Sequence, residues 1–205
     1  MFCLTKPTAA EIRNFLKHCR ADDFSYAEIG SSRFGERFET AAEYSFDHNR
    51  IKIGNGAEDY GKAVEAVKSW KMFDLSWVEL HRTDTPIIVG ENVAVLASHF
   101  GFWSLNASRI VYLIEENDGA VEKFGFAYGT LTEHGESGEE RFTVEFHKEN
   151  GEVWYDLYAF SKPQHILAQI GFPIARMLQS EFAEDSKKAM VRAGRNKSIP
   201  TDCSP

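Results

Sequence analysis

The stretch that decides the fold is residues 128–142, which read YGTLTEHGESGEERF. An aromatic, strand-like run ends at the beginning of this stretch, and a second strand-like run begins at Phe142. The residues between the two runs form a polar turn. The pattern predicts two neighbouring strands, and a short turn can join such strands only if they are antiparallel. Four carboxylates and one histidine lie in this stretch, so it is also the first place to look for a site.

Strand-like runs continue on both sides of this stretch. Between Leu75 and Phe160 the chain alternates between apolar or β-branched runs and short turns, such as the hairpin-type turn at Glu149-Asn150-Gly151. An extended run also occupies residues 43–53. We therefore expect one antiparallel sheet of about six or seven strands. In residues 124–129, large rings alternate with glycine or alanine, a pattern that allows a sheet to curve and to approach its neighbours closely.

Three segments show helical spacing instead of strand alternation. Thr8 and Glu11 form a capping-box pattern that opens a short N-terminal helix. Asn55 precedes a second helix, with acidic residues in its first turn. A longer helix runs to about Met190, and its apolar stripe consists of Ile174, Met177, Leu178 and Phe182. This order of elements predicts an α+β fold in which a strongly curved sheet wraps around the long C-terminal helix.

Composition narrows the class of protein. The 205 residues carry a net charge of −8, which disfavours binding to nucleic acid or to anionic lipid. No apolar run approaches the length needed to span a membrane. The three cysteines form no disulfide framework, and the first residues lack a signal-peptide pattern, so we expect a cytoplasmic protein. No sequence motif calls for a cofactor.

The composition also suggests three parts of the chain. Residues 1–42 hold the N-terminal helix and an irregular segment, residues 43–192 hold the sheet and the long helix, and residues 193–205 form a polar tail that we expect to be disordered.

A resemblance supports this fold. The segments GFAYGTLTEHGESGEERF, IKIGNG, AVKSWKMFDLSWVEL, RIVYLIE and AFSKP resemble the uncharacterised family catalogued as domain of unknown function nineteen-ninety, from about Phe24 to Met190. The resemblance implies membership of the helix-grip superfamily, with the lipid-transfer (START-like) and birch-pollen-allergen-like proteins. Members of that superfamily mostly bind apolar ligands between sheet and helix, and a minority are cyclases or hydrolases. The family itself implies no activity.

Our first hypothesis is a small, mostly apolar or amphipathic ligand held between the sheet and the last helix. Aromatic residues are abundant, at 13% of the chain, and rings can line a pocket as well as fill a core. The candidate ligand-binding residues are Trp103, Tyr128, Glu140, Arg141 and Tyr158. Sequence alone does not tell whether the space is open or filled by these rings, nor whether the protein forms oligomers.

A second hypothesis is an enzyme on the same scaffold, with Glu140 or His134 as acid or base. Adjacent strand residues point to opposite faces of a sheet, so Glu139 and Glu140 cannot act on one substrate together. If Glu140 shares the face of Phe142, it is buried and needs a partner, for which Arg109 or Arg141 is a candidate. A metal site at His134 and its neighbouring carboxylates is disfavoured, because no second histidine stands at a ligand spacing. A third hypothesis is an interaction module with a solid core.

Overall fold

The computed structural model describes residues 1–35, 41–81, 86–132, 136–163 and 172–195. Its strands form one antiparallel sheet, in the order β2-β8-β7-β6-β5-β4-β3, with β1 paired to β5. Their bounds are β1 Phe2–Cys3, β2 Ser45–Asn55, β3 Val78–His81, β4 Asn92–His99, β5 Phe102–Glu116, β6 Val121–Thr130, β7 Glu136–His147 and β8 Glu152–Pro163.

The described helices are α1 (Ala9–His18), α2 (Gly56–Lys68) and α4 (Phe172–Arg195). The predicted capping box at Thr8 and Glu11 is present at the start of α1. Four short 3-10 turns connect the larger elements, namely η1 Cys19–Ala21, η2 Ser31–Phe34, η3 Ala41–Glu43 and η4 Lys71–Phe73. None of the helices in the described ranges is both long and apolar enough to cross a membrane.

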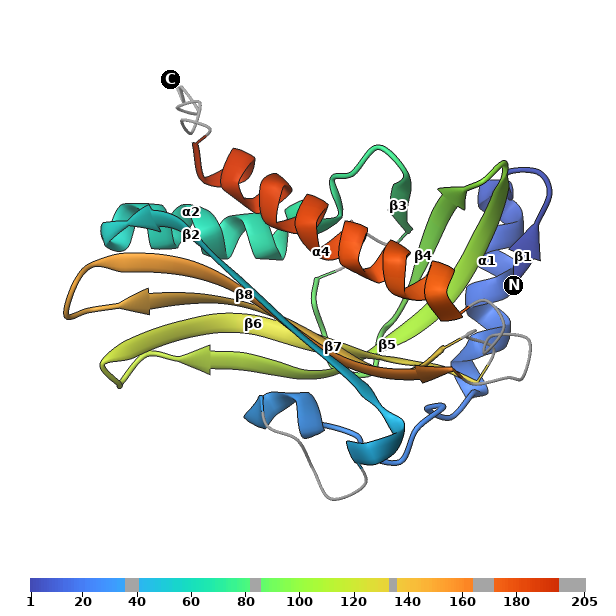
Figure 1. Ribbon diagram of the computed structural model, residues 1–205, viewed down its shortest axis with the longest axis horizontal. Coiled ribbons are helices and arrows are strands. Elements are labelled where there is room, and N and C mark those ends of the chain that lie inside the picture. Colours follow the sequence, from blue (N-terminus) through green and yellow to red (C-terminus); the bar gives the residue numbers. More distant parts are fainter. Residues whose placement is uncertain (36–40, 82–85, 133–135, 164–171, 196–205) are drawn as a thin grey trace, which may run out of the picture.

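The sheet separates two layers. Helices α2 and α4 cover one face, which we call the inner face, whereas α1 and η2 lie on the other, the outer face (Figure 1). This is the predicted helix-grip architecture, with a curved antiparallel sheet around a long C-terminal helix and a short N-terminal helix added. The sequence pattern and the resemblance both led to it, and it is confirmed.

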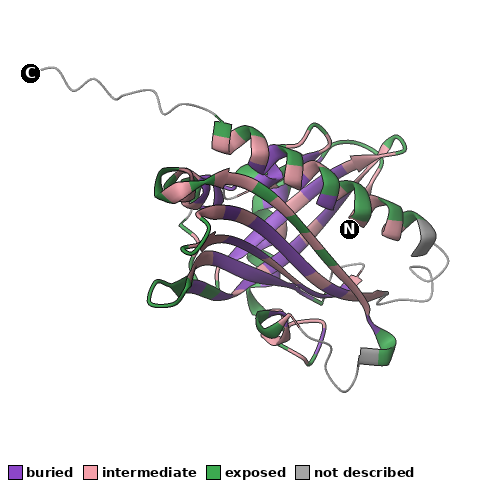
Figure 2. Ribbon diagram, turned by 60° about the vertical axis from the view of Figure 1, so that its left-hand side comes forward, coloured by how far each residue is buried: buried purple, intermediate pink, exposed green. Residues whose placement is uncertain are grey.

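The main core lies between the inner face, α2 and the second half of α4. Phe126, Phe142 and Tyr155 of the sheet are fully buried there, together with Val67 of α2 and Met190 of α4. The middle parts of the strands are buried, while α4 keeps an exposed side toward solvent (Figure 2). The second half of α4 is therefore fixed by apolar packing.

The segment that follows α1 is fixed to the outer face by one carboxylate. Glu139 of β7 is buried and accepts hydrogen bonds from the Tyr26 hydroxyl at 2.7 Å, the Gly30 amide at 2.7 Å, the Ser32 amide at 3.0 Å and the Ser32 hydroxyl. A buried carboxylate is tolerated when several donors surround it.

The predicted division of the chain at residues 42 and 193 stays a prediction.

Two glycines let the strands approach one another. A Cβ atom on Gly125 would stand 2.1 Å from the Phe142 carbonyl oxygen, and one on Gly138 would stand 2.0 Å from the Phe160 carbonyl oxygen. Neither obstacle is a movable side chain, so any larger residue would force neighbouring strands apart. Gly125 belongs to the run where the sequence predicted close approach.

We expect Gly125→Ala to lower the free energy of unfolding by about 2–4 kcal/mol, because the added methyl group displaces backbone. Gly61→Ala is the matched control: it lies in α2, is exposed, and has no atom within 4 Å of the added Cβ. The control is expected to raise stability by about 0.5–1 kcal/mol through helix propensity. Urea denaturation of both variants measures this, and equal effects would contradict the steric argument.

Candidate functional site

A cavity of about 970 Å³ lies between the inner face and the first half of α4. Its helical wall runs from Ile174 to Ala183 and overlaps at Phe182 and Ala183 with the part of α4 that packs into the core. The second half of α4 therefore packs into the core, whereas the cavity separates its first half from the sheet. The sheet side of the wall comes from strands β2 to β8, so most of the sheet contributes.

The wall of the cavity is mainly apolar. Apolar side chains from several elements contribute to it, including Phe46, Phe73, Val95, Phe102, Leu157 and Phe182. Aliphatic and aromatic walls with a few polar groups are typical of small-molecule sites. The space is also at the upper end of the usual size for such sites. The premise of the third hypothesis, a solid core, is therefore not met.

Glu140 is the carboxyl that faces this space. It pairs in register with Tyr128 on β6 and Ala159 on β8, and all three residues line the cavity. The Tyr128 hydroxyl donates a hydrogen bond to Glu140 Oε2 at 2.6 Å. Burial raises the pKa of Glu140 to about 7, and the nearby carboxylates Glu136 and Asp47 act in the same direction. The pKa of Tyr128 is raised well above its usual value by burial and by Glu140.

The predicted face of Glu140 is confirmed, but the predicted partner is wrong. Arg109 donates instead to Asn92 Oδ1 at 2.8 Å and to backbone carbonyls around Cys19. Arg141 lies on the outer face and donates to Asp156. Both arginines are committed elsewhere, and a neutral phenol takes the place of the expected cation.

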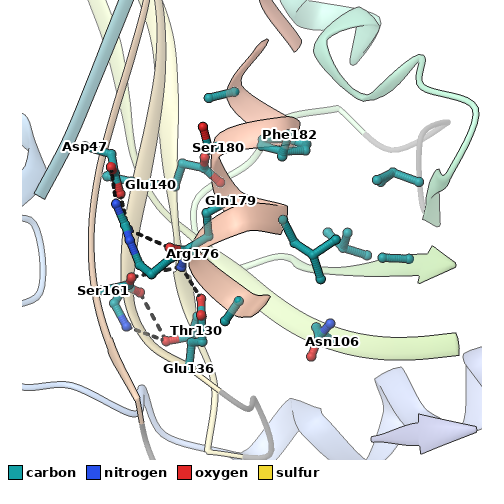
Figure 3. A pocket seen from close by; sticks show the side chains of 18 of the residues that line it. Asp47, Asn106, Thr130, Glu136, Glu140, Ser161, Arg176, Gln179, Ser180 and Phe182 are labelled. Carbon is teal, nitrogen blue, oxygen red and sulfur yellow. Dashed lines mark hydrogen bonds and ion pairs between the residues drawn. The ribbon is translucent and has the colours of Figure 1, made fainter. Parts of the chain in front are cut away.

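A chain of polar contacts ties the first half of α4 to the sheet (Figure 3). Arg176 donates to both oxygens of Asp47, at 2.5 and 2.6 Å. Gln179, one turn later, donates to Glu136 at 2.5 Å and to Ser161 at 3.0 Å. Burial raises the pKa of Glu136, whereas the Gln179 hydrogen bond and the Arg176 charge act against that rise. At this end of α4, the polar contacts replace the apolar packing of the other end.

The predicted stripe of α4 needs a correction for the same reason. Phe182 packs against the core as expected, but Ile174 and Met177 are 51% and 48% exposed. Polar Arg176 and Gln179 are turned toward the sheet beside them. Spacing alone could not reveal this, because their partners Asp47 and Glu136 stand far away in the sequence. Asp47, Arg176 and Gln179 are therefore wall residues that the sequence pattern did not indicate.

The structure separates the five candidate ligand-binding residues. Tyr128 and Glu140 line the cavity, whereas the described wall does not include Trp103, Arg141 or Tyr158. Trp103 packs on the outer face with the cluster formed by α1 and β4, and the Lys6 ammonium lies 5.3 Å from its ring. Strand alternation explains the split, because Ser104 and Leu157, their neighbours along the chain, face inward.

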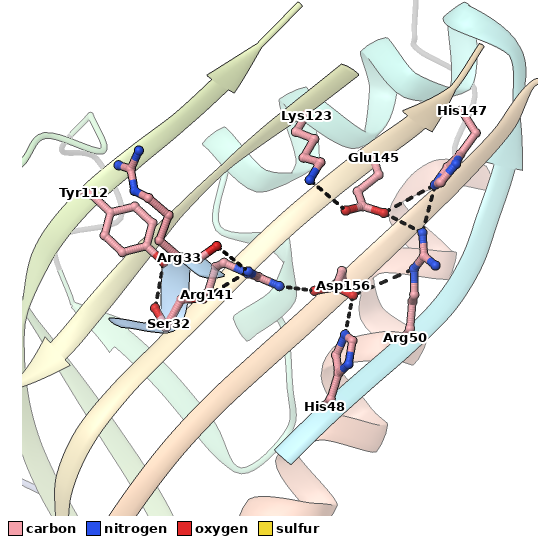
Figure 4. A network of polar contacts seen from close by, with 10 residues as sticks. All are labelled: Ser32, Arg33, His48, Arg50, Tyr112, Lys123, Arg141, Glu145, His147 and Asp156. Atoms are coloured by element: carbon pink, nitrogen blue, oxygen red, sulfur yellow. Dashed lines mark hydrogen bonds and ion pairs between the residues drawn. The ribbon is translucent and has the colours of Figure 1, made fainter. Parts of the chain in front are cut away.

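Arg141 belongs to a network of polar contacts on the outer face (Figure 4), and its guanidinium group lies 5.3 Å from the centre of the Tyr158 ring. Its centre is Asp156, which is buried and bonds Arg141 at 2.7 Å and His48 at 2.6 Å. Arg50 contacts Asp156 and Glu145, and so links β2 and β8 to β7. These contacts connect neighbouring strands of the sheet, so they give Arg141 and Tyr158 a structural role.

The acidic turn does not gather into one site. Glu136 and Glu140 face inward, but Glu139 faces outward and is held by Tyr26 and η2. His134 lies outside the described residues. Across the described ranges, no group of three or more histidine, cysteine or acidic side chains is placed to hold a metal ion.

Comparison with known proteins identifies the family. The model described as "Domain of unknown function (DUF1990)" matches residues 25–189. The chain belongs to this family. A relative named UPF0548 protein, from Dictyostelium discoideum, is 40% identical over 214 residues and covers 97% of this chain and 99% of its own length. A UPF0548 protein from Arabidopsis thaliana is 32% identical over 151 residues, which is 73% of each chain. The predicted resemblance is confirmed.

Solved structures resemble the chain more distantly. A hypothetical protein from Helicobacter pylori has a TM-score of 0.49 at 10% identity, and covers 78% of this chain and 94% of its own. Norcoclaurine synthase from Thalictrum flavum, in complex with dopamine and hydroxybenzaldehyde, has a TM-score of 0.42 at 12% identity, with 75% and 90% covered. At these values nothing about a ligand or a reaction transfers to this chain.

The raised pKa of Glu140 predicts a dependence of stability on pH. The pKa is about 7 in the folded protein and near the usual 4.5 in the unfolded chain. Between these values the folded protein binds more protons than the unfolded chain, so stability falls as the pH rises. The contribution is fully present below about pH 4.5 and is lost as the pH rises through about 7.

Glu140→Gln removes this titration while keeping the side-chain shape. We therefore expect the unfolding free energy of the wild type, minus that of the variant, to decrease by on the order of 2–3 kcal/mol between about pH 4.5 and 8. Denaturant unfolding at a series of pH values measures the difference. A difference that stays constant over this range would mean that Glu140 has an ordinary pKa.

Proposed function

We propose that this protein binds a small, mostly apolar molecule in the cavity under α4, with a polar group of that molecule at Glu140. The observation that carries the proposal is the cavity itself, about 970 Å³ of space with mainly apolar walls and the half-buried carboxyl of Glu140. Native interiors are normally packed without voids of this size. A stable domain that maintains such a space gains from an occupant.

Burial of apolar surface would supply most of the affinity. An apolar body with about 300 Å² of surface gains on the order of 7 kcal/mol when it leaves water, before the cost of association is subtracted. The polar group then fixes the orientation of the ligand, because a buried carboxyl without a partner is unfavourable. Tyr128 holds one carboxyl oxygen of Glu140 in place for this contact.

Filling the cavity tests the proposal. Ala159 lies on the inner face of β8 and lines the cavity, next to Glu140 in the register of the sheet. We expect Ala159→Phe to lower the affinity for Nile red, a neutral apolar dye, by about tenfold or more, because the new ring occupies the space. Titration followed by the fluorescence of the dye measures the affinity.

Ala57→Phe is the control, since Ala57 is exposed in the first turn of α2, away from the cavity wall. It adds the same ring to the surface and is expected to leave dye binding unchanged. Circular dichroism confirms that both variants are folded. A wild-type protein that binds no dye, or equal binding by both variants, would contradict the proposal.

A second candidate function is acid or base catalysis on a ligand in the same cavity. A specific observation favours it: Glu140 has a pKa of about 7, which lets the group both accept and give up a proton at neutral pH. We expect a metabolite extract incubated with the protein to lose one component and gain another, as read by mass spectrometry. Glu140→Gln should abolish this conversion, and an extract that stays unchanged with the wild type would exclude the candidate.

A further inference from the structure

The charges that face the cavity are unequal. Asp47, Glu136 and Glu140 contribute three carboxyls, and Arg176 contributes one guanidinium. Three further titratable groups in the wall do not change this balance. The Glu139 carboxylate is bound on the outer face, and the His48 ring bonds Asp156 there. His99 also lines the cavity, and burial lowers its pKa, which favours its neutral form.

Arg176, the one guanidinium or ammonium group among the described wall residues, already has a carboxylate partner. Both terminal nitrogens of Arg176 donate to Asp47, in the two-bond geometry that makes guanidinium–carboxylate pairs strong. Because Asp47 and Arg176 bind each other through two hydrogen bonds, the positive charge of Arg176 is largely neutralised and has little effect on Glu140. Among the described residues, the groups that act on Glu140 are Tyr128, Glu136, Asp47 and Tyr155, and none of them carries positive charge.

Glu140 itself has room for one more partner. Its Oε2 accepts from Tyr128, while Oε1 accepts no hydrogen bond from any described part of the chain. The residue lines the cavity, so a donor that reaches Oε1 has to come from the occupant. A carboxylate in an apolar space near other carboxylates is stabilised most by a positive charge that also donates a hydrogen bond. An anionic head group would be repelled from the same place.

We propose that the ligand is an amphipathic amine, whose protonated nitrogen donates a hydrogen bond to Glu140 while its apolar body fills the space under α4. This inference rests on the proposed function and names the chemical class of its ligand. The Asp47–Arg176 pair closes the cavity beside the head group, and the apolar wall from β4, β5 and α4 receives the body.

Three probes with one apolar body test the inference. Phenylbutylamine, phenylbutanol and phenylbutyrate share a phenyl ring on a four-carbon chain, and the end of the chain is cationic, neutral or anionic. Near pH 8, where Glu140 is largely ionised, we expect the amine to bind the wild type at least about tenfold more tightly than the alcohol, and the butyrate to bind most weakly. Isothermal titration calorimetry measures all three. An alcohol or a butyrate that binds as tightly as the amine would overturn the inference.

Two variants test whether Glu140 is the residue that causes the preference for the amine. Glu140→Gln should reduce the advantage of the amine over the alcohol to less than about threefold, because the amide has no charge. Glu149→Gln removes the same charge from the exposed β7–β8 turn and should keep the advantage. An advantage that survives in Glu140→Gln would place the cation elsewhere and refute the assignment.

A measurement on the wild type covers the case in which Glu140→Gln does not fold. Because the amine needs an ionised Glu140, its affinity should rise about tenfold per pH unit below about pH 7 and level off above it, whereas the affinity for the alcohol should not rise. A pH-independent preference contradicts the inference.

The two proposals fail in different ways. If Nile red binds but the amine has no advantage, the ligand class is wrong and the proposed function stands. If neither the dye nor any of the three probes binds, the proposed function is wrong, and the inference falls with it.

Discussion

The apolar packing of the second half of α4 against the inner face is the constraint on which the rest of the structure depends. Met190 is fully buried there, and the Ser186 and Tyr155 hydroxyls hydrogen-bond at 2.8 Å within the same contact. Since a helix is stiff, seating one end on a curved sheet determines how far the other end stands from it. The cavity is the geometric result of that difference, and the polar contacts of Arg176 and Gln179 close its helical side.

Two adjacent carboxylates show how strand alternation divides structural and functional roles. Glu139 faces outward, where four donors from the preceding segment satisfy it, and it acts as an anchor. Glu140 faces inward, where a single phenol hydroxyl reaches it. In these surroundings burial raises the pKa of Glu140. A change at either position therefore affects a different face of the sheet.

Much of the fold could be predicted, because its signals are local. The antiparallel sheet followed from short turns, the curvature from glycines opposite large rings, and the inward direction of Glu140 from its parity with Phe142. The walls of the cavity were harder. Composition made Trp103 and Tyr158 candidate pocket residues, yet each stands one position away from a wall residue. Which face of the sheet a residue of a long strand points to cannot be predicted without knowing where the strand has bulges. Arg176 and Asp47 escaped notice because a pair so distant in sequence leaves no periodic signal.

The anchoring of Glu139 has a consequence for how the chain divides. Composition changes near residue 42, and a boundary there separates an irregular leader from the sheet. The donors that solvate this carboxylate, however, come from Tyr26, Gly30 and Ser32, on the far side of that boundary. A shortened chain that began with β2 would retain the buried charge and lose everything that compensates it. Residues 26–32 thus supply hydrogen-bond donors for a buried carboxylate of the sheet, although a change in composition separates the two parts of the chain.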